Sequence, residues 1–247
     1  MAQLLEVHGL HKHFGGVRAL DGVDLSLQAG QVYCVVGPNG CGKTTPLCVI
    51  SGDLAPTAGS VHFDGRDITG LAPARIARMG VLRKFQAPGI CPTLSVAENL
   101  EVALMAQLAP WRRLGGRSHL ARLEQLLDIV LLSGRRHTIG QELAHGEKQW
   151  LEIGMLMAGD SRLLLLDEPT AGMTIRETQQ TVALIRRVAV EHGRTVLAIE
   201  HDMHFVAGLD CEVIAMMRGK VLCRGSYAEV SHNPEVRQSY LGSSAHA

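Results

Sequence analysis

Aromatic residues, net charge and long apolar runs are all scarce in this sequence. Aromatic side chains make up only 4% of its 247 residues, which is too few for a surface that stacks nucleic-acid bases. Basic residues and acidic residues both number 24, so the formal net charge is zero. This balance argues against a strongly basic nucleic-acid binder and against an acidic, solvating tail.

No segment has the composition of a membrane span or of a secretory signal. No apolar run approaches the roughly 18 residues that a transmembrane helix needs. The first residues lack a basic start followed by an apolar block, so we expect no secretory signal. The six cysteines form no C-x-x-C pair, which favours reduced thiols in the cytoplasm over a disulfide framework or a zinc site.

What is present is the composition of a folded globular protein. Hydrophobic residues make up 46% of the chain and charged residues 19%, which excludes disorder over its whole length. The length allows one large domain or one domain with a subdomain.

Two kinds of strand are predicted. Apolar and polar residues alternate, as in a half-buried antiparallel sheet, in segments 4–7, 23–27 and 60–63. Nearly continuous apolar runs, typical of central strands in a parallel sheet, occupy segments 32–36, 162–166 and 195–199. Helical patterns alternate with these runs, so the predicted fold is α/β.

The middle of the chain has a helical pattern and no convincing central strand. Leu120, Leu123, Leu127 and Leu131 recur on one face of a helix predicted over residues 118–132. Six arginines face only two carboxylates in segment 106–136. This basic segment fits a solvated helix face, or a surface that contacts lipid head groups or a partner.

The strongest motif follows the first buried strand. The phosphate-loop pattern G-x-x-x-x-G-K-[ST] is matched in full by Gly37, Pro38, Asn39, Gly40, Cys41, Gly42, Lys43 and Thr44. Glycines let successive N–H groups point at phosphate oxygens, and the following helix N-terminus favours negative charge. We therefore predict a nucleotide site that extends to Thr45.

Two side chains of the loop carry specific roles. Lys43 supplies a positive charge to the β and γ phosphates and is a predicted catalytic group, and Thr44 offers a hydroxyl to Mg²⁺. Pro46, in the first helical turn, biases Thr45 away from helical dihedral angles, so we expect local strain there.

An acidic pair ends the second buried strand. Asp167 is placed to hold Mg²⁺, and Glu168 is placed to activate or orient an attacking water. Alternatively, Asp167 and Glu168 are solvated acids at the end of a strand, with no functional role. His201 follows the third buried strand, where it is either a γ-phosphate contact or a structural histidine.

These motifs, in this order, resemble the ATP-binding-cassette (ABC) ATPases over about residues 4–241. The resemblance implies an α/β P-loop cassette with a mixed core sheet, an antiparallel β subdomain and a helical subdomain at about 87–158, all in a single domain. It also implies that adenine stacks on Phe14 with Val17 beside it. By the same resemblance, Gln86 is a catalytic and Mg²⁺-binding residue that links the site to membrane subunits, and His201 is the switch histidine.

A second motif of the family lies at segment 143–149, Leu-Ala-His-Gly-Glu-Lys-Gln. It stands at the signature position, which implies that Ala144, Gly146 and Glu147 contact the nucleotide of an opposing subunit. The usual signature is Leu-Ser-Gly-Gly-Gln, so this chain lacks the serine hydroxyl. It also places the Glu147 carboxylate near the triphosphate, and we expect Lys148 to reduce the resulting repulsion. Thr174 stands where many relatives have an aspartate.

Two segments resemble a narrower group. Arg83-Lys84-Phe85-Gln86 and segment 145–155 are similar to the ATP-binding subunits of branched-chain amino-acid importers, and most of all to the urea type. The function implied is ATP hydrolysis for import of urea, short amides or branched-chain amino acids. The cofactors implied are ATP and Mg²⁺.

The partners implied are a second ATP-binding subunit, identical or different, permease subunits and, indirectly, a solute-binding protein. The implied location is the inner face of the cell membrane. Two alternatives remain: a soluble ABC ATPase of DNA repair or translation, and a regulatory nucleotide-binding module with little turnover. The first usually has coiled-coil insertions or two cassettes, and intact Lys43, Asp167, Glu168 and His201 argue against the second.

Overall fold

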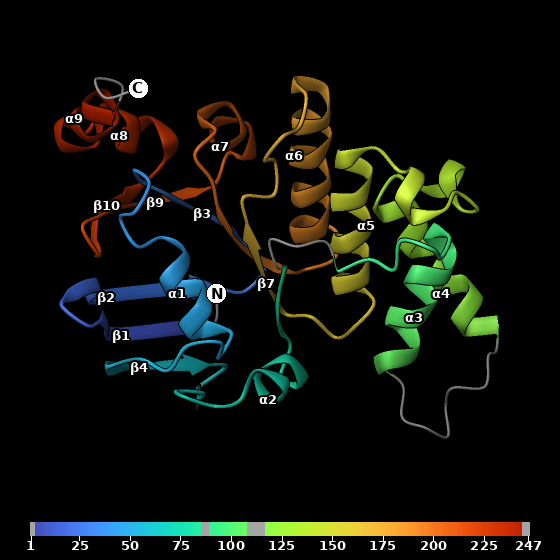
Figure 1. Cartoon of the computed structure of the whole chain (residues 1–247), viewed down its shortest axis with the longest axis horizontal. Helices are drawn as coiled ribbons and strands as arrows, with labels where there is room; N and C mark the ends of the chain where they lie inside the picture. Colours follow the sequence, from blue (N-terminus) through green and yellow to red (C-terminus); the bar gives the residue numbers. More distant parts are fainter. Residues whose placement is uncertain (1–2, 85–88, 108–116, 244–247) are drawn as a thin grey trace.

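The computed structural model describes residues 3–84, 89–107 and 117–243 and contains two sheets (Figure 1). The first is antiparallel, in the order β2-β1-β4-β5. Its strands are β1 (Gln3–Phe14), β2 (Val17–Gln28), β4 (Ala58–Phe63) and β5 (Arg66–Asp67). The alternating segments of the sequence lie in β1, β2 and β4, so their prediction is confirmed.

The second sheet has the order β10-β9-β3-β8-β7-β6. Its strands are β3 (Val32–Val36), β6 (Val81–Arg83), β7 (Leu163–Asp167), β8 (Thr195–Ile199), β9 (Glu212–Met217) and β10 (Lys220–Gly225). Neighbouring strands are parallel except for the antiparallel β9–β10 pair. The parallel order brings the carboxyl ends of β3, β7 and β8 to one edge, where ligands of open α/β sheets bind.

Both faces of this mixed sheet are covered, which explains its continuous apolar runs. Along β3, Cys34 and Val36 belong to a core shared with the helices, whereas Tyr33 and Val35 belong to a core shared with the antiparallel sheet. β7 divides in the same way, because successive side chains point to opposite faces of a strand. The described residues therefore form two cores, one on each side of the mixed sheet.

Helices fill the remaining connections. They are α1 (Thr44–Ile50), α2 (Pro73–Arg78), α3 (Val96–Gln107), α4 (Arg117–Ile129), α5 (His145–Met157), α6 (Ile175–Val190), α7 (Met203–Leu209), α8 (Tyr227–His232) and α9 (Pro234–Ser243), with short 3₁₀ turns at η2 (Ser133–Arg135) and η3 (Gly140–Glu142). Figure 1 shows α3, α4 and α5 grouped on one side of the molecule, with α6 standing beside α5.

One strand in the middle segment was not predicted. β6 pairs with β7 in parallel and forms the edge of the mixed sheet. It has three residues, which is too short to give a periodic signal. Gly80, at φ +101°, leads into it, and a Cβ there would lie 2.8 Å from the Asp160 carbonyl oxygen.

The predicted face of the 118–132 helix is partly wrong. Leu123 and Leu127 are fully buried, but Leu120 and Leu131 are 54% and 47% exposed. α4 ends at Ile129, and Leu131 has a left-handed φ of +61°. The buried face continues through Leu126 instead.

Three arginines of the basic segment, Arg122, Arg135 and Arg136, bond to groups of their own chain. Arg135 pairs with Glu147, and Arg136 pairs with Glu124. Arg122 donates to the Met157 carbonyl oxygen at 2.9 Å. These contacts favour the solvated-face reading for this part of the segment. None of the helices in the described part of the chain has the length and apolarity needed to cross a membrane.

Candidate functional site

The loop after β3 is shaped by glycines that no other residue can replace. Gly37 has φ +156° and Gly42 has φ +100°. A Cβ on Gly37 would lie 2.3 Å from the Met216 carbonyl oxygen, and one on Gly42 would lie 2.3 Å from that of Ala19. Such distances are far inside van der Waals contact, so the two glycines permit a close approach of backbone to backbone.

Neighbouring strands brace the loop through backbone hydrogen bonds. The Gly219 N–H, in the turn between β9 and β10, donates to the Cys41 carbonyl oxygen at 2.9 Å. The Gly219 carbonyl oxygen in turn accepts from the Asp21 N–H at 2.9 Å. The phosphate loop is thus tied to both sheets, which holds its curve in place.

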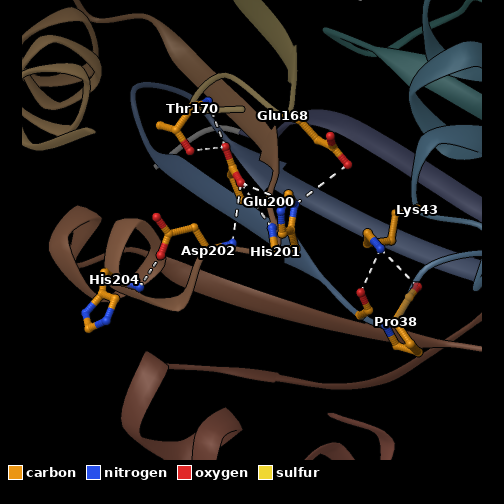
Figure 2. Close-up of polar contacts among 9 residues, drawn as sticks. Pro38, Lys43, Glu168, Thr170, Glu200, His201, Asp202 and His204 are labelled. Atoms are coloured by element: carbon orange, nitrogen blue, oxygen red, sulfur yellow. Dashed lines mark hydrogen bonds and ion pairs between the residues drawn. The ribbon is translucent and has the colours of Figure 1, made fainter. Parts of the chain in front are cut away.

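Lys43 is the buried cation of the loop, with only 7% of its surface exposed. Its Nζ donates to the carbonyl oxygens of Gly37 at 2.6 Å and Pro38 at 3.0 Å (Figure 2). These bonds fold the Lys43 side chain back onto the backbone of its own phosphate loop. The expected departure of Thr45 from helical geometry is wrong, because Thr45 lies within α1 and Pro46 is buried in the same turn.

The loop lines a cavity of about 410 Å³. Its wall contains Val17, Arg18, Ala19, Asn39, Gly40, Cys41, Gly42, Lys43, Thr44, Thr45, Glu168, Arg218 and Gly219. Seven of the residues predicted to contact nucleotide, from Asn39 to Thr45, are therefore grouped around one hollow with Val17 and Glu168.

Phe14 lies at the end of β1, opposite Val17 in the strand pairing. It is 47% exposed, and the Lys12 Nζ lies 5.1 Å from the centre of its ring. An aromatic ring this exposed is not a core residue. Through its pairing with Val17, the exposed ring lies beside the cavity that Val17 lines.

Asp167 ends β7 with a side chain only 1% exposed. The Arg83 guanidinium, at the end of β6, donates to its Oδ2 at 3.2 Å and to Asp53 at 3.0 Å. Burial raises the pKa of Asp167 above its usual value, and the Arg83 charge opposes that rise. The sequence pattern gives Arg83 no role, because the three-residue strand β6 that places it is too short to predict.

Glu168 has an unusual backbone. Its φ of +46° is left-handed, which costs a non-glycine residue of order 1–3 kcal/mol and is most often found at functional sites. The Glu168 N–H donates to the Ile199 carbonyl oxygen of β8 at 3.0 Å. This geometry turns the 37%-exposed side chain toward the phosphate-loop cavity.

His201 comes from the adjacent strand end. Its Nδ1 lies 3.8 Å from a carboxylate oxygen of Glu168 and 3.8 Å from one of Glu200 (Figure 2). The predicted acid and the predicted switch histidine are therefore brought together. Glu200 was missed by sequence reasoning, although its signal was visible: a carboxylate directly continues a buried apolar strand.

The signature segment forms the start of α5, with Ala144 as a cap residue that has no side-chain acceptor. Glu147 compensates, because its Oε2 accepts from the Ala144 N–H at 3.0 Å while its Oε1 pairs with Arg135 at 3.0 Å. Glu147 forms its ion pair with Arg135 and not with Lys148. Lys148 instead donates to the Gln141 carbonyl oxygen at 3.1 Å.

The structure does not bring every predicted residue to the cavity. Among the described residues, none of segment 143–149 lines it. Gln86 lies outside the described residues. Nor do the described residues contain a cluster of three or more His, Cys, Asp or Glu side chains able to hold a metal alone. Thr44 lines the cavity, whereas Asp167 is not part of its wall and has a side chain that is 1% exposed. A hydroxyl and a carboxylate oxygen are nevertheless the kinds of donor that suit Mg²⁺, which combines few protein oxygens with phosphate oxygens.

Comparisons with known proteins agree with this geometry. A family model described as "ABC transporter" matches residues 20–171, and one described as "Branched-chain amino acid ATP-binding cassette transporter" matches residues 220–246. The branched-chain amino acid transport ATP-binding protein BraF of Pseudomonas aeruginosa is 36% identical, covering 97% of this chain and 98% of BraF. LivG of Escherichia coli K12 is 34% identical, covering 97% of this chain and 98% of LivG.

Solved structures give the same result. The crystal structure of an ATP-binding cassette of an ABC transporter in its ADP conformation has a TM-score of 0.87 and 28% identity, covering 98% of this chain and 100% of that one. A nucleotide-free cassette has a TM-score of 0.84 and 27% identity, covering 97% of this chain and 99% of that one. With a family model over more than half of its length, and with these relatives, this chain belongs to the ABC transporter family as an ATP-binding cassette ATPase.

Proposed function

We propose that this chain binds ATP with Mg²⁺ at the phosphate loop and hydrolyses it with Glu168 as the group that takes a proton from water. One observation carries the proposal: the cavity at the phosphate loop is lined both by Lys43 and Thr44 and by Glu168 from another strand end. Phosphate binding and water activation require groups on the same cavity. The regulatory-module alternative has no comparable support.

In this proposal the water oxygen forms a bond to the γ phosphorus while the bond from that phosphorus to the ADP oxygen breaks. Glu168 accepts the proton that water loses, and ADP and phosphate leave. His201, 3.8 Å from Glu168, orients the γ phosphate or the Glu168 carboxylate. Lys43 neutralises charge on the β and γ phosphates.

Thr44 and Asp167, with Gln86, are the residues proposed to hold Mg²⁺. When bound, the ion would supply positive charge that stabilises the phosphate groups of ATP. The protein's own task is to keep Asp167 oriented, which Arg83 does by occupying one carboxylate oxygen. Phe14 and Val17 form the proposed adenine platform.

The proposed working unit is a dimer of ATP-binding subunits seated on permease subunits at the inner face of the membrane, with a solute-binding protein outside. Ala144, Gly146 and Glu147 would contact the nucleotide of the opposing subunit. The proposed domain is residues 4–241, with a helical subdomain at about 87–158.

A branched-chain amino acid is the proposed transported solute. Its support is the similarity to BraF and LivG, together with the C-terminal family match at residues 220–246. Urea or a short amide is the second candidate, because segments 83–86 and 145–155 resemble those of the urea-type importer subunits. Uptake of labelled leucine and of labelled urea, in cells with and without this chain, separates the two.

The test of hydrolysis is Glu168→Gln. An amide cannot accept the proton from water, so phosphate release should fall to background while ATP binding stays near the wild-type level. Phosphate release is measured for the full chain, alone and with its membrane partners. Near-normal turnover of this variant would remove the assignment of Glu168.

A further inference from the structure

Glu200 is the most deeply buried carboxylate at the site, and the proposed mechanism does not use it. It follows β8 directly and has no exposed surface. Its backbone N–H donates to the Val35 carbonyl oxygen of β3 at 3.1 Å, so its main chain is anchored to the strand that leads into the phosphate loop.

The Glu200 carboxylate accepts hydrogen bonds from two separate loops (Figure 2). Its Oε1 accepts from the Thr170 N–H at 2.9 Å and from the Thr170 hydroxyl at 2.5 Å. Its Oε2 accepts from the N–H groups of His201 at 3.1 Å and Asp202 at 3.5 Å. Each oxygen therefore serves one loop, and four donors surround a group that water does not reach.

This arrangement is costly unless it is complete. Burying a carboxylate requires that it be hydrogen-bonded, because its transfer from water is otherwise strongly unfavourable. A leucine would fill about the same volume and would not need four hydrogen-bond donors around it. What the carboxylate adds is a fixed spacing between the turn that follows Glu168 and the loop that carries His201.

We propose that Glu200 is a positioning residue that holds the Glu168 turn and the His201 loop in one rigid unit for ATP hydrolysis. It acts through Thr170, two residues after Glu168, and through the backbone of His201. Two hydrogen bonds hold the left-handed backbone of Glu168 in place. One runs from the Glu168 N–H to the Ile199 carbonyl oxygen, and the other runs from the Thr170 N–H to the Glu200 carboxylate. The inference rests on the proposed roles of Glu168 and His201.

The first test is Glu200→Gln in the full chain, assayed with its membrane partners. The amide oxygen can keep the Thr170 bonds, but its NH₂ then faces two N–H donors of the His201 loop. Misplacement of a catalytic group by about 1 Å can cost 100-fold in rate, so we expect kcat to fall about 10- to 100-fold. The KM for ATP should stay within about twofold, because the phosphate loop is untouched.

A matched control separates positioning from stability. Asn99 is also fully buried, and it makes four hydrogen bonds, all to backbone groups of residues 91–95 in the region of α3. Asn99→Asp is likewise an amide–carboxylate exchange, and it destabilises the fold away from the cavity. Assayed below its melting temperature, it should keep the wild-type kcat. An equal loss of kcat in both variants would overturn the proposal.

Thr170 gives a second test that leaves Glu200 in place, in case Glu200→Gln does not fold. Thr170→Ser keeps the hydroxyl donor and should keep kcat within about twofold. Thr170→Val, close to threonine in shape, removes that donor and should lower kcat about 10-fold with KM unchanged. Equal kcat values for the serine and valine variants would overturn the proposal.

The final test asks whether Glu200 acts through His201 and Glu168. In a His201→Ala background, Glu200→Gln should add little further loss, because residues that act as a unit are not additive. Independent, multiplying losses would contradict the proposal. Failure of the underlying mechanism gives a different result from failure of this inference. If Glu168 is not the group that accepts the proton, Glu168→Gln keeps its turnover. If only the role of Glu200 is wrong, Glu168→Gln is inactive and Glu200→Gln has normal turnover.

Discussion

Two helix starts in this chain are proposed to face ATP, and they are built in opposite ways. The loop that leads into α1 has no acidic residue in the first turn and presents Lys43 and Thr44. The start of α5 carries Glu147, whose carboxylate accepts the Ala144 N–H. The positive end of a helix attracts anions. The first start can therefore receive a phosphate, whereas the second already holds an anion of its own.

A second carboxylate strengthens this contrast. Glu177, at the start of α6, lies so near α5 that a Cβ on Gly146 would be 2.7 Å from its Oε1. Hydrogen bonds from the backbone N–H and the hydroxyl of Thr174 hold the pKa of Glu177 below its usual value. The signature end of α5 therefore already has two carboxylates beside it, and Arg135 pairs with only one of them, Glu147. We infer that it is a weak anion binder.

The largest effect is expected from removing the buried cation of the first start. Lys43→Ala should abolish phosphate release and weaken ATP binding, because the β and γ phosphates lose their counter-charge. The matched change Lys148→Ala, at the second start, should leave ATP binding by this chain unchanged. Phosphate release and nucleotide titration measure both. Comparable losses in the two variants would erase the contrast between the helix starts.

The next largest effect should come from converting the second start toward the first. Ala144→Ser with Glu147→Gln supplies a hydroxyl donor and removes a carboxylate. A hydrogen bond to a charged group contributes about 1.5–3 kcal/mol, so homodimer turnover should rise about 10-fold or more. Loss of the Arg135 pair and of the Ala144 cap offsets part of this gain.

The same double variant can be paired with a partner whose phosphate loop is inactive. Only the site built from Lys43 then turns over, and that site uses the partner's signature. The double change should leave the steady-state rate almost unaltered in this pairing. A large increase there would show that the signature serves its own subunit.

A smaller effect is expected at the edge of the cavity. Phe14→Ala should weaken nucleotide affinity by roughly 1–3 kcal/mol if adenine stacks on it as bases stack on aromatic rings elsewhere. The ring is 47% exposed, so its removal should hardly change the melting temperature. A loss of stability with unchanged affinity would contradict the stacking role.

The smallest effect concerns the helix cap beside the signature. Glu177→Gln should lower the free energy of unfolding by about 1 kcal/mol at pH 7, because Gln keeps only part of the capping box with Thr174. The folded-state pKa of Glu177 is depressed. Its stabilisation is therefore present above the ordinary glutamate pKa and is lost as pH falls through the folded-state value.

Urea unfolding of wild type and Glu177→Gln at pH 7, and again near pH 4, follows this difference. The gap between the two proteins should shrink at the lower pH. A gap that widens on acidification would reverse the assigned direction of the pKa shift.

Local patterns predicted much of the fold because they report which faces of an element are buried. The alternating segments became β1, β2 and β4, and the apolar runs became β3, β7 and β8. The start of α6 also depends on neighbouring residues alone, because Thr174 and Glu177 form a capping box. β6 and the end of α4 escaped prediction, because three residues carry no period and Leu131 takes a left-handed turn that leucine rarely adopts.

The sequence by itself determined the phosphate loop, the acidic pair and the family, because each rests on residue types at fixed local spacing. Only the tertiary structure decided which distant groups meet. Arg83 reaches Asp167 across 84 residues, Glu200 clamps Thr170 across 30, and Arg135 rather than Lys148 balances Glu147. These partnerships depend on the order of strands and the packing of helices, which bring together side chains whose separation along the chain carries no signal.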